Sequence, residues 1–337
     1  MFRMFRRFRT RPLIAGAAAA SLFAVSACGA SQAGDDANWT PSQPIEMVAP
    51  AETGGGWDTL ARSASRILED TGKIDQDMQV INKPGAGGAI GWAYVAGNAG
   101  DPHKLFVTSP PIVLVPLAGQ SEVDHTDFTP IARLATDYAA YLVPADSPLK
   151  SFDDLVTKLK ENPASLSIAG GSAPGSMDHV AVAGAANAAG VDASNLKYVP
   201  FDGGGEATTA LLGGHVDVAV SGAGEITELA KSGKVRVLSV SSDERLDTLP
   251  DVPTLKEAGV DYTYDIWRGV MGPADLTDGQ VAYYESKFEE LTKTDAWRTE
   301  IAKYGWADSY LGSDEFGTFL DEQKNATADI LGEIGLR

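Results

Sequence analysis

The chain has 337 residues, a formal net charge of −19, four histidines and a single cysteine. So acidic a chain is repelled by a phosphate backbone, and we therefore expect no nucleic-acid partner. One cysteine cannot form an intrachain disulfide, and the histidines lack the spacing of zinc ligands, so we expect no metal site.

The first residues predict an export signal. Five arginines precede an uncharged, alanine-rich run at residues 13–27. The run is shorter than the roughly 20 apolar residues of a membrane-spanning helix, and small residues end it. Val25-Ser26-Ala27-Cys28 matches the bacterial lipobox, so residues 1–27 are predicted to be a lipoprotein signal peptide and Cys28 the lipid anchor. The alternative is an ordinary secretory signal that leaves a free thiol.

Residues 28–43 are polar and lack periodicity, which is typical of a flexible tether. Residues 44–337 are long enough for two lobes with separate cores, and they contain no further apolar span. We therefore expect an extracytoplasmic monomer that is anchored to the cell membrane through its N-terminal lipid.

Apolar stretches alternate with amphipathic stretches of helical length through most of residues 44–337, which predicts βαβ units and the α/β class. Strands are predicted at residues 45–49, 78–81, 105–108, 131–135, 140–143, 166–169, 196–199, 216–220 and 235–240. Helices are predicted at residues 59–70, 90–98, 152–160, 177–189, 206–212, 226–232, 278–291, 296–304 and 313–334.

Glycine-rich loops follow predicted strands and precede predicted helices at residues 53–56, 84–88, 170–175, 202–205 and 221–224. In open parallel sheets, ligands bind beyond the carboxyl ends of the strands. Glycine lets the backbone approach a ligand, and the following helix offers unpaired N–H groups and a partial positive charge. The loops are therefore candidate anion sites. The alternative is that they are tight turns and spacers between helix and sheet.

Several segments resemble signatures of one family of receptors. They are residues 45–62, with Ala-Pro-Ala-Glu-Thr-Gly-Gly-Gly-Trp-Asp inside them, residues 82–88 (Asn-Lys-Pro-Gly-Ala-Gly-Gly), residues 204–217 and residues 267–273 (Trp-Arg-Gly-Val-Met-Gly-Pro). In this order they resemble the receptors of tripartite tricarboxylate transporters, the TctC or Bug family of periplasmic solute receptors.

The resemblance implies a type II periplasmic-binding-protein fold, in which two α/β lobes are joined by two crossover segments. Lobe 1 would comprise residues 44–138 plus 266–337, and lobe 2 residues 139–265. The implied ligand is a small di- or tricarboxylate such as citrate, and the implied partner is a two-component integral membrane transporter.

The resemblance also implies ligand contacts, made largely by backbone amides. In the first loop they fall on Thr53, Gly54, Gly55, Gly56, Trp57 and Asp58, at a strand end on Thr108 and Ser109, and in the second lobe on Gly171, Ser172, Ser176 and Asp202. Tyr138 and Trp267 are further candidates, because they lie near the two expected crossings between the lobes.

Three of the side chains have alternative interpretations. Asp58 precedes a predicted helix and is interpreted first as its N-cap. Trp57 could form a wall of the cleft or pack its helix onto the sheet. Arg268 is a candidate counter-ion for the ligand, or one half of a surface ion pair.

Other functions remain open. Ser172 or Ser176 with His179 would suggest a serine hydrolase, but residues 170–174 lack the Gly-x-Ser-x-Gly pattern, so we assign no catalytic residues and expect no enzyme. Residues 85–90 approximate a dinucleotide fingerprint, yet Ile90 stands where glycine or alanine is needed, so no cofactor is expected. A receptor that signals to a sensor kinase is a further alternative.

Overall fold

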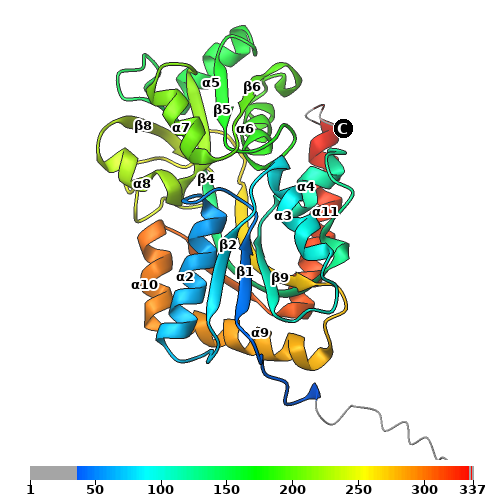
Figure 1. The fold of residues 1–337 in the computed structure, drawn as a ribbon. Coiled ribbons are helices and arrows are strands. Elements are labelled where there is room, and N and C mark those ends of the chain that lie inside the picture. The colour runs from blue at the N-terminus through cyan, green and yellow to red at the C-terminus, as the bar shows by residue number, and fades with distance from the viewer. Residues whose placement is uncertain (1–35, 334, 336–337) are drawn as a thin grey trace, which may run out of the picture.

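The computed structural model describes residues 36–333 and 335 (Figure 1). The predicted signal peptide, Cys28 and the first half of the predicted tether lie outside these residues. Within this part of the chain, no helix combines the length and the apolar character needed to cross a bilayer.

The strands are β1 (Ile45–Ala49), β2 (Met78–Asn82), β3 (Lys104–Thr108), β4 (Phe128–Pro144), β5 (Ser167–Gly170), β6 (Lys197–Pro200), β7 (Val218–Gly222), β8 (Val235–Val240), β9 (Asp265–Pro273) and β10 (Ala307–Leu311). The helices are α2 (Gly56–Asp70), α3 (Ala89–Ala96), α4 (Pro111–Leu117), α5 (Phe152–Glu161), α6 (Met177–Ala188), α7 (Gly204–Leu212), α8 (Ala223–Lys231), α9 (Asp278–Thr292), α10 (Asp295–Tyr304) and α11 (Ser313–Glu333).

One long strand, β4, belongs to two sheets. Its first half pairs with β9 and β10, and its second half pairs with β7 and β8. The change of partner falls between Tyr138, which lies opposite Asp265, and Ala139, which lies opposite Gly222. The first sheet continues from β9 through β3 and β1 to β2, and the second from β7 through β5 to β6. We call the halves built on these sheets lobe 1 and lobe 2, the lower and upper halves of Figure 1.

Helices cover both faces of each sheet. In lobe 1, α2, α9 and α10 pack on one face, while α3, α4 and α11 pack on the other. In lobe 2, α5 and α6 cover one face, and α7 and α8 cover the other. Helix α2 illustrates how a helix packs on a sheet. Its apolar residues recur at Leu60, Ala64, Ile67 and Leu68, so in a helix with 3.6 residues per turn they form one apolar face that is buried.

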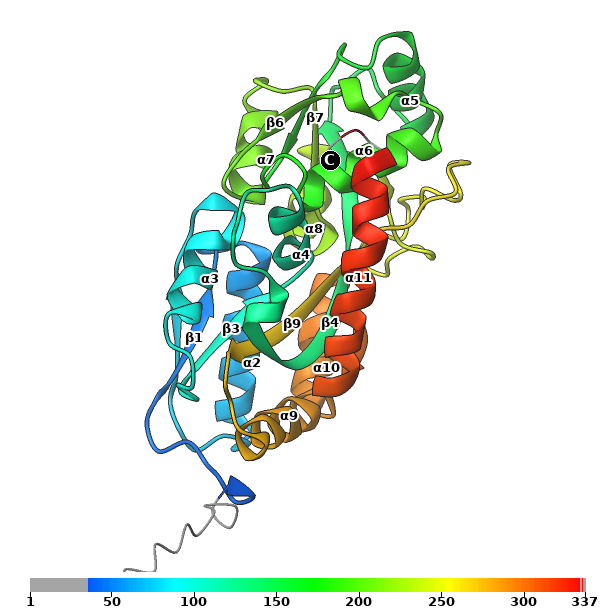
Figure 2. The same cartoon turned by 90° about the vertical axis from the view of Figure 1, so that its right-hand side faces the viewer.

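The last helix, α11, reaches from one lobe to the other. Phe316 and Leu320, near its start, belong to the core of lobe 1, and Leu331 belongs to the core of lobe 2. Figure 2 shows the helix running along the side of the molecule past both halves. A helix of this length spans about 30 Å, enough to bridge two small cores.

The α/β class and the fold are those predicted, with differences at particular elements. Residues 131–135 and 140–143 were predicted as separate strands, but both belong to β4. The polar residues Thr136 and Asp137 between them suggest an interruption of the strand, yet both side chains are buried within β4. Helix α4 has a proline at each end of an apolar run, and β10 is short and polar, so neither was predicted.

Asp137 is buried because it pairs with Arg268 from β9. The Asp137 Oδ2 atom lies 2.6 Å from Arg268 Nη2, and the two side chains are 0% and 2% exposed. Its Oδ1 atom accepts hydrogen bonds from the Tyr138 N–H at 2.8 Å and from the Gly224 N–H at 3.2 Å. The pair thus joins β4 and β9 to the start of α8.

Replacing Asp137 with alanine should lower the free energy of unfolding by about 3–5 kcal/mol, because Arg268 would remain buried without its closest partner. Urea denaturation measures this change. Lys158→Ala is the control, since it breaks an exposed pair with Glu161 and should cost less than about 1 kcal/mol. Equal and small effects of the two substitutions would contradict the assigned role of the buried pair.

Candidate functional site

A cavity of about 460 Å³ lies between the two lobes. It is lined by residues at the carboxyl ends of β6 and β7, in the segments that follow β1, β2, β3, β5, β6 and β7, and by Arg268 of β9. Each of the five predicted glycine-rich loops contributes to its wall. The carboxyl ends of strands from both sheets therefore meet at one site, as expected for an open α/β sheet.

The helices that begin at this cavity lack side-chain caps. The N-cap residues of α2, α3, α6, α7 and α8 are Gly55, Gly88, Ser176, Gly203 and Gly222, and none caps its helix with a side-chain hydrogen bond. Helices that begin elsewhere differ: Ser151, Thr277 and Thr294 cap α5, α9 and α10 through their side chains. The helix N-termini around the cavity thus keep partial positive charge and some unpaired N–H groups, although Glu225 accepts the Gly56 N–H of α2 and Ser172 accepts the Asp178 N–H of α6.

Two glycines allow close approaches in the cavity wall. A Cβ atom on Gly56 would lie 2.2 Å from Arg268 Nη1, so only glycine lets α2 begin against this guanidinium. A Cβ atom on Gly171 would lie 2.1 Å from the Gly204 nitrogen, so glycine lets the loop after β5 touch the start of α7. Both contacts are to groups that a side chain would have to push aside.

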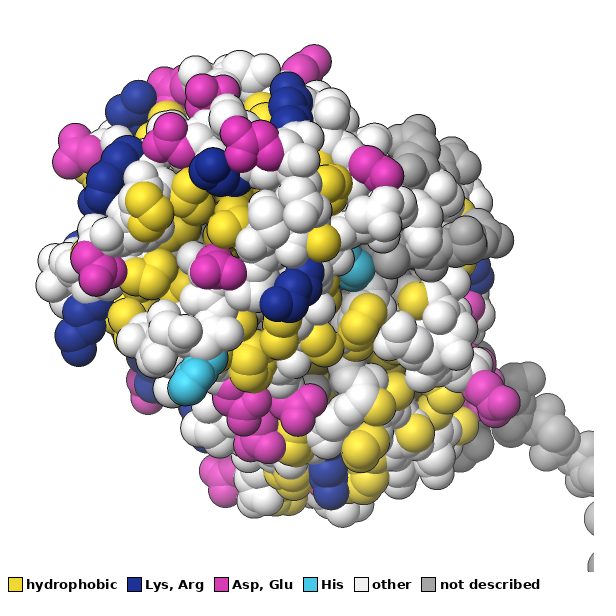
Figure 3. Space-filling view, turned by 90° about the horizontal axis from the view of Figure 1, so that it is seen from above, with side chains coloured by type: hydrophobic (Ala, Val, Ile, Leu, Met, Phe, Trp, Pro, Cys, Tyr) yellow, Lys and Arg dark blue, Asp and Glu magenta, His cyan; other side chains and the backbone are white. Residues whose placement is uncertain are grey.

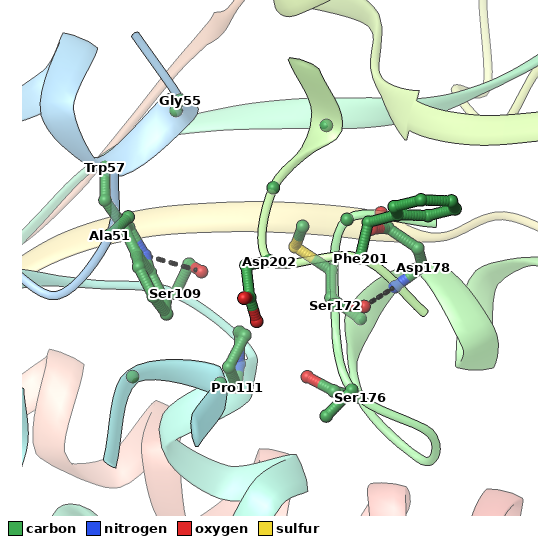
Figure 4. Close-up of a pocket in the computed structure, with 18 of the residues that line it drawn as sticks. Ala51, Gly55, Trp57, Ser109, Pro111, Ser172, Ser176, Asp178, Phe201 and Asp202 are labelled. Atoms are coloured by element: carbon green, nitrogen blue, oxygen red, sulfur yellow. Dashed lines mark hydrogen bonds between the residues drawn. The ribbon is translucent and has the colours of Figure 1, made fainter. Parts of the chain in front are cut away.

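Trp57 forms part of the lobe 1 wall (Figure 4). Its indole Nε1–H donates to Ser109 Oγ at 2.9 Å, and its ring meets Trp92 edge-on at 6.2 Å. Trp57 therefore lines the cavity, and its bond to Ser109 also links the start of α2 to the segment after β3; contact with a ligand stays a prediction. Asp202, on the opposite side, directs its carboxylate into the space between Ser109 and Ser176 (Figure 4).

The positive charge of Arg268 is already paired with carboxylates of the protein, so it is not available to a ligand carboxylate. Besides its bond to Asp137, its Nη2 atom lies 3.8 Å from Glu225 Oε1, and the same oxygen accepts the Gly56 N–H at 3.1 Å. Burial raises the pKa of Glu225, while Arg268 lowers it. Arg268 thus forms a buried cluster and not the predicted surface ion pair.

Asp178 is the most deeply buried acid in the cavity wall, at 2% exposure. Burial and then the nearby Glu225 raise its pKa to about 7, although hydrogen bonds from Ser172 and Gly171 favour the charged form. Its backbone N–H donates to Ser172 Oγ at 2.9 Å, as Figure 4 shows. Within the described residues, its Oδ1 atom has no hydrogen-bond partner.

The predicted contact residues divide into two groups. Those that line the cavity are Gly55, Gly56, Trp57, Ser109, Gly171, Ser172, Ser176 and Asp202. Those outside its lining are Thr53, Gly54, Asp58, Thr108, Tyr138 and Trp267. Thr108 and Trp267 are at most 1% exposed, and Trp267 packs edge-on against Phe316 and Phe319 in the lobe 1 core.

Asp58 is not the N-cap of α2, because the helix begins two residues earlier, at Gly56. Its carboxylate accepts hydrogen bonds from the Gly54 N–H, the Arg62 guanidinium and the Asn82 amide. These bonds lower its pKa against the opposing effect of burial, which is the largest single influence. Asp58 thus shapes the loop before the helix from behind the cavity.

Sequence reasoning missed Asp178, Glu225 and Phe201 as cavity residues. The two acids lie in the first turns of α6 and α8, immediately after predicted glycine-rich loops. Position alone could have suggested them. The sequence predicted the loops before these helices as candidate anion sites, but it did not predict that the two acids themselves line the cavity.

The hydrolase alternative is not supported by the geometry. His179 accepts the Gly175 N–H at its Nδ1 atom and stacks on Tyr198 at 4.3 Å, while Ser176 Oγ has no partner within the described residues. Burial lowers the pKa of His179 to about 4. The imidazole is therefore a neutral structural group. In the described part of the chain, no cluster of His, Cys, Asp or Glu could hold a metal ion.

In the ligand-free protein, Asp178→Asn should raise the free energy of unfolding at pH 8 and change it little at pH 4. The pKa rises from 3.8 to about 7 on folding, so the native state disfavours the charged form, and stability falls as the pH rises between these values. At about 1.4 kcal/mol per pKa unit, the expected gain at pH 8 is up to roughly 4 kcal/mol.

Urea denaturation of both proteins at both pH values measures this gain. Asp153→Asn is the control, because Asp153 is an exposed acid in the first turn of α5. It should affect stability equally little at the two pH values. An equal gain for Asp178→Asn at pH 4 and pH 8 would contradict the prediction.

Comparison with known proteins agrees with the sequence motifs and the fold. Residues 61–336 match the model of the family described as "Tripartite tricarboxylate transporter family receptor". The "UPF0065 protein in gbd 5'region" of Cupriavidus necator is 30% identical over 333 residues, 97% of this chain and 98% of that protein.

Two solved structures are similar over most of their length. A TctC solute binding protein from Polaromonas is 29% identical with a TM-score of 0.65, over 87% of this chain and 99% of that one. The periplasmic binding protein BugD is 25% identical with a TM-score of 0.80, over 88% and 99%. The chain belongs to the TctC or Bug family of tripartite tricarboxylate transporter receptors, and it is a solute-binding receptor and not an enzyme.

Proposed function

We propose that the protein captures a small di- or tricarboxylate, such as citrate, outside the cytoplasm and delivers it to a two-component integral membrane transporter. The observation that carries this proposal is the set of uncapped helix N-termini around one cavity. Hydrogen bonds to a charged group contribute about 1.5–3 kcal/mol each, and micromolar affinity needs about 8.2 kcal/mol. About three to five converging donors would therefore hold a carboxylate without a free cationic side chain.

The family supports both the transporter partner and the choice of test ligands. MatC from Rhodopseudomonas palustris, which shares the fold at 23% identity and a TM-score of 0.76 over 86% of this chain and 99% of its own, was solved with bound malate. Malate and citrate are therefore the first ligands to test. The partner is proposed from the family's description as a receptor of tripartite transporters.

The lobes are proposed to close around the ligand as two bodies, residues 44–138 plus 266–337 and residues 139–265. The change of partner along β4 between Tyr138 and Ala139 supports this division. Closure brings the loops of both lobes onto one ligand and creates a surface that the transporter can distinguish from the open form.

Carboxylates should raise the melting temperature of the full-length protein, purified in detergent, while sugars and nucleotides should not. A ligand at 100 times its dissociation constant stabilises by about 2.7 kcal/mol, which corresponds to a shift of at least about one degree. Differential scanning fluorimetry with citrate, malate, glucose and AMP measures this. A shift with glucose or AMP alone would refute the proposed ligand class.

Gly171→Ala should weaken carboxylate binding by at least about tenfold, because its Cβ atom would push the loop after β5 away from the Gly204 backbone. Gly205→Ala is the matched control, since a Cβ atom there meets nothing within 4 Å. Isothermal titration calorimetry compares the two variants. Equal affinities would show that the close approach of the two loops does not matter for binding.

Cys28→Ser should release the protein from the membrane fraction, because the hydroxyl cannot accept the thioether-linked lipid. Membrane fractionation and partitioning into detergent measure the change. Ser31→Ala, downstream in the same predicted tether, should leave the protein in the membrane fraction. Membrane retention of Cys28→Ser would refute the proposed anchor.

A further inference from the structure

Residues 36–42, which we call the docked segment, lie against lobe 1 and in front of β1. The ring of Trp39 meets Tyr283 of α9 edge-on at 5.4 Å and packs tilted against Tyr284 at 5.6 Å. The Ser42 N–H donates to His103 Nε2 at 3.2 Å. Contacts at both ends of the segment therefore hold it to the lobe.

The carboxylate of Asp36 binds the start of α9. It accepts the Gly279 N–H at 3.1 Å and the Thr277 hydroxyl. The Asp36 carbonyl accepts the Trp39 N–H at 3.0 Å, which closes a turn. A Cβ atom on Gly279 would overlap the Asp36 carbonyl, so glycine at this position lets the segment lie across the helix start.

The docked segment lies at the end of lobe 1 that is farthest from lobe 2. Figures 1 and 2 both show the dark-blue start of the described chain below α9, at the opposite end of the molecule from α5. The strands of lobe 1 point their carboxyl ends the other way, toward the cavity. A pull on the N-terminus therefore acts on the end of the receptor that is remote from the ligand site.

Docking shortens the chain that is available as a tether. Residues 28–35 lie between Cys28 and the docked segment, and eight residues span at most about 29 Å. Sixteen free residues, 28–43, would span up to about 58 Å. A compact body of about 300 residues has a radius of gyration of about 19 Å and is about 50 Å across. The shorter reach is less than this width, so it prevents lobe 2 from turning toward the bilayer, whereas the longer reach would allow it.

Charge does not provide this orientation. The connections around the docked segment expose several carboxylates, and the nearby Lys73 ammonium is already 3.4 Å from Glu290. The exposed acids are Asp75, Asp77, Asp275 and Asp278. At the opposite end, which Figure 3 shows from above, basic side chains lie next to acidic ones over lobe 2. An anionic bilayer would repel the lobe 1 end more than the lobe 2 end, so the tether must set which end faces the membrane.

We propose that the α9 end of lobe 1 is the membrane-facing end of the receptor, and that the docked segment holds it there with lobe 2 directed away from the bilayer. The inference rests on the proposed lipid anchor at Cys28. The partner of this end is the lipid surface, which it meets at a distance that the docked tether limits.

The first test measures docking on the full-length protein in detergent. Trp39 is the first aromatic residue after Cys28, so chymotrypsin can cut the tether there only when the segment leaves lobe 1. Gly279→Ala should be cut about tenfold faster, and Asp36→Ala, which removes the bonds to α9, should behave alike. Gly332→Ala is the matched control, because it is also a helical glycine and a Cβ atom there meets nothing within 4 Å. Unchanged cleavage in both test variants would overturn the docking.

The second test measures orientation on liposomes with an acceptor dye on the lipid headgroups. Donor dyes are attached through Asp75→Cys or Ala164→Cys, two exposed positions at the far ends of lobe 1 and lobe 2, because the thiol of Cys28 is taken up by its lipid. Energy transfer should be at least about twofold greater from position 75, and Gly279→Ala should narrow this difference.

The outcomes separate this inference from the anchor on which it rests. Equal transfer from the two positions, or greater transfer from position 164, would overturn the proposed orientation while the anchor stands. A protein that does not associate with liposomes would refute the lipid anchor, and the orientation with it.

Discussion

The buried pair of Arg268 and Asp137, together with the partly exposed Glu225, forms the cluster on which the arrangement of the two lobes depends. Arg268 comes from β9 of lobe 1, Asp137 from the strand that both sheets share, and Glu225 from α8 of lobe 2. Buried charges persist only when paired. Because Glu225 also accepts the Gly56 N–H, the cluster ties the start of α2 to lobe 2 across the floor of the cavity. The same charges that hold the lobes together therefore set the electrostatics of the ligand site.

This cluster also explains which parts of the molecule the sequence could not predict. Asp137 interrupts an apolar run, which suggests the end of a strand. Its partner Arg268 lies 131 residues away, so the local sequence does not show that the carboxylate is paired and buried. Trp267 and Arg268 are neighbours on β9, and side chains alternate between the faces of a strand. Trp267 therefore packs into the core while Arg268 reaches the cavity. The sequence analysis included Trp267 among the ligand contacts. The local sequence does not show which residues of β9 point to the core and which point to the cavity.

The glycine-rich loops could be predicted because their chemistry is local. A run of glycines after an apolar strand and before an amphipathic helix indicates a helix start without a side-chain cap, as found at Gly55 and Gly203. The convergence of these loops on one cavity followed from the rule that parallel sheets bind ligands at their carboxyl edges. Asp58 was misassigned because the helix starts inside the glycine run, which moved the cap position upstream. Which acids face the ligand depends on how the two lobes meet, and no local pattern encodes that.

Helix α11 gives the molecule a mechanical property beyond its role in the two cores. Near its start Phe316 packs in the core of lobe 1, and near its end Leu331 packs in the core of lobe 2. A Cβ atom on Gly335 would lie 2.9 Å from the Cβ atom of Ser194 in lobe 2. Because α11 is packed in the cores of both lobes, the lobes cannot rotate apart freely. Opening of the cleft must therefore bend this helix or detach its last turns from lobe 2. The extent of opening is thus limited by the packing of one helix end. A fluorophore near the C-terminal end of α11 would therefore move with lobe 2 and not with lobe 1.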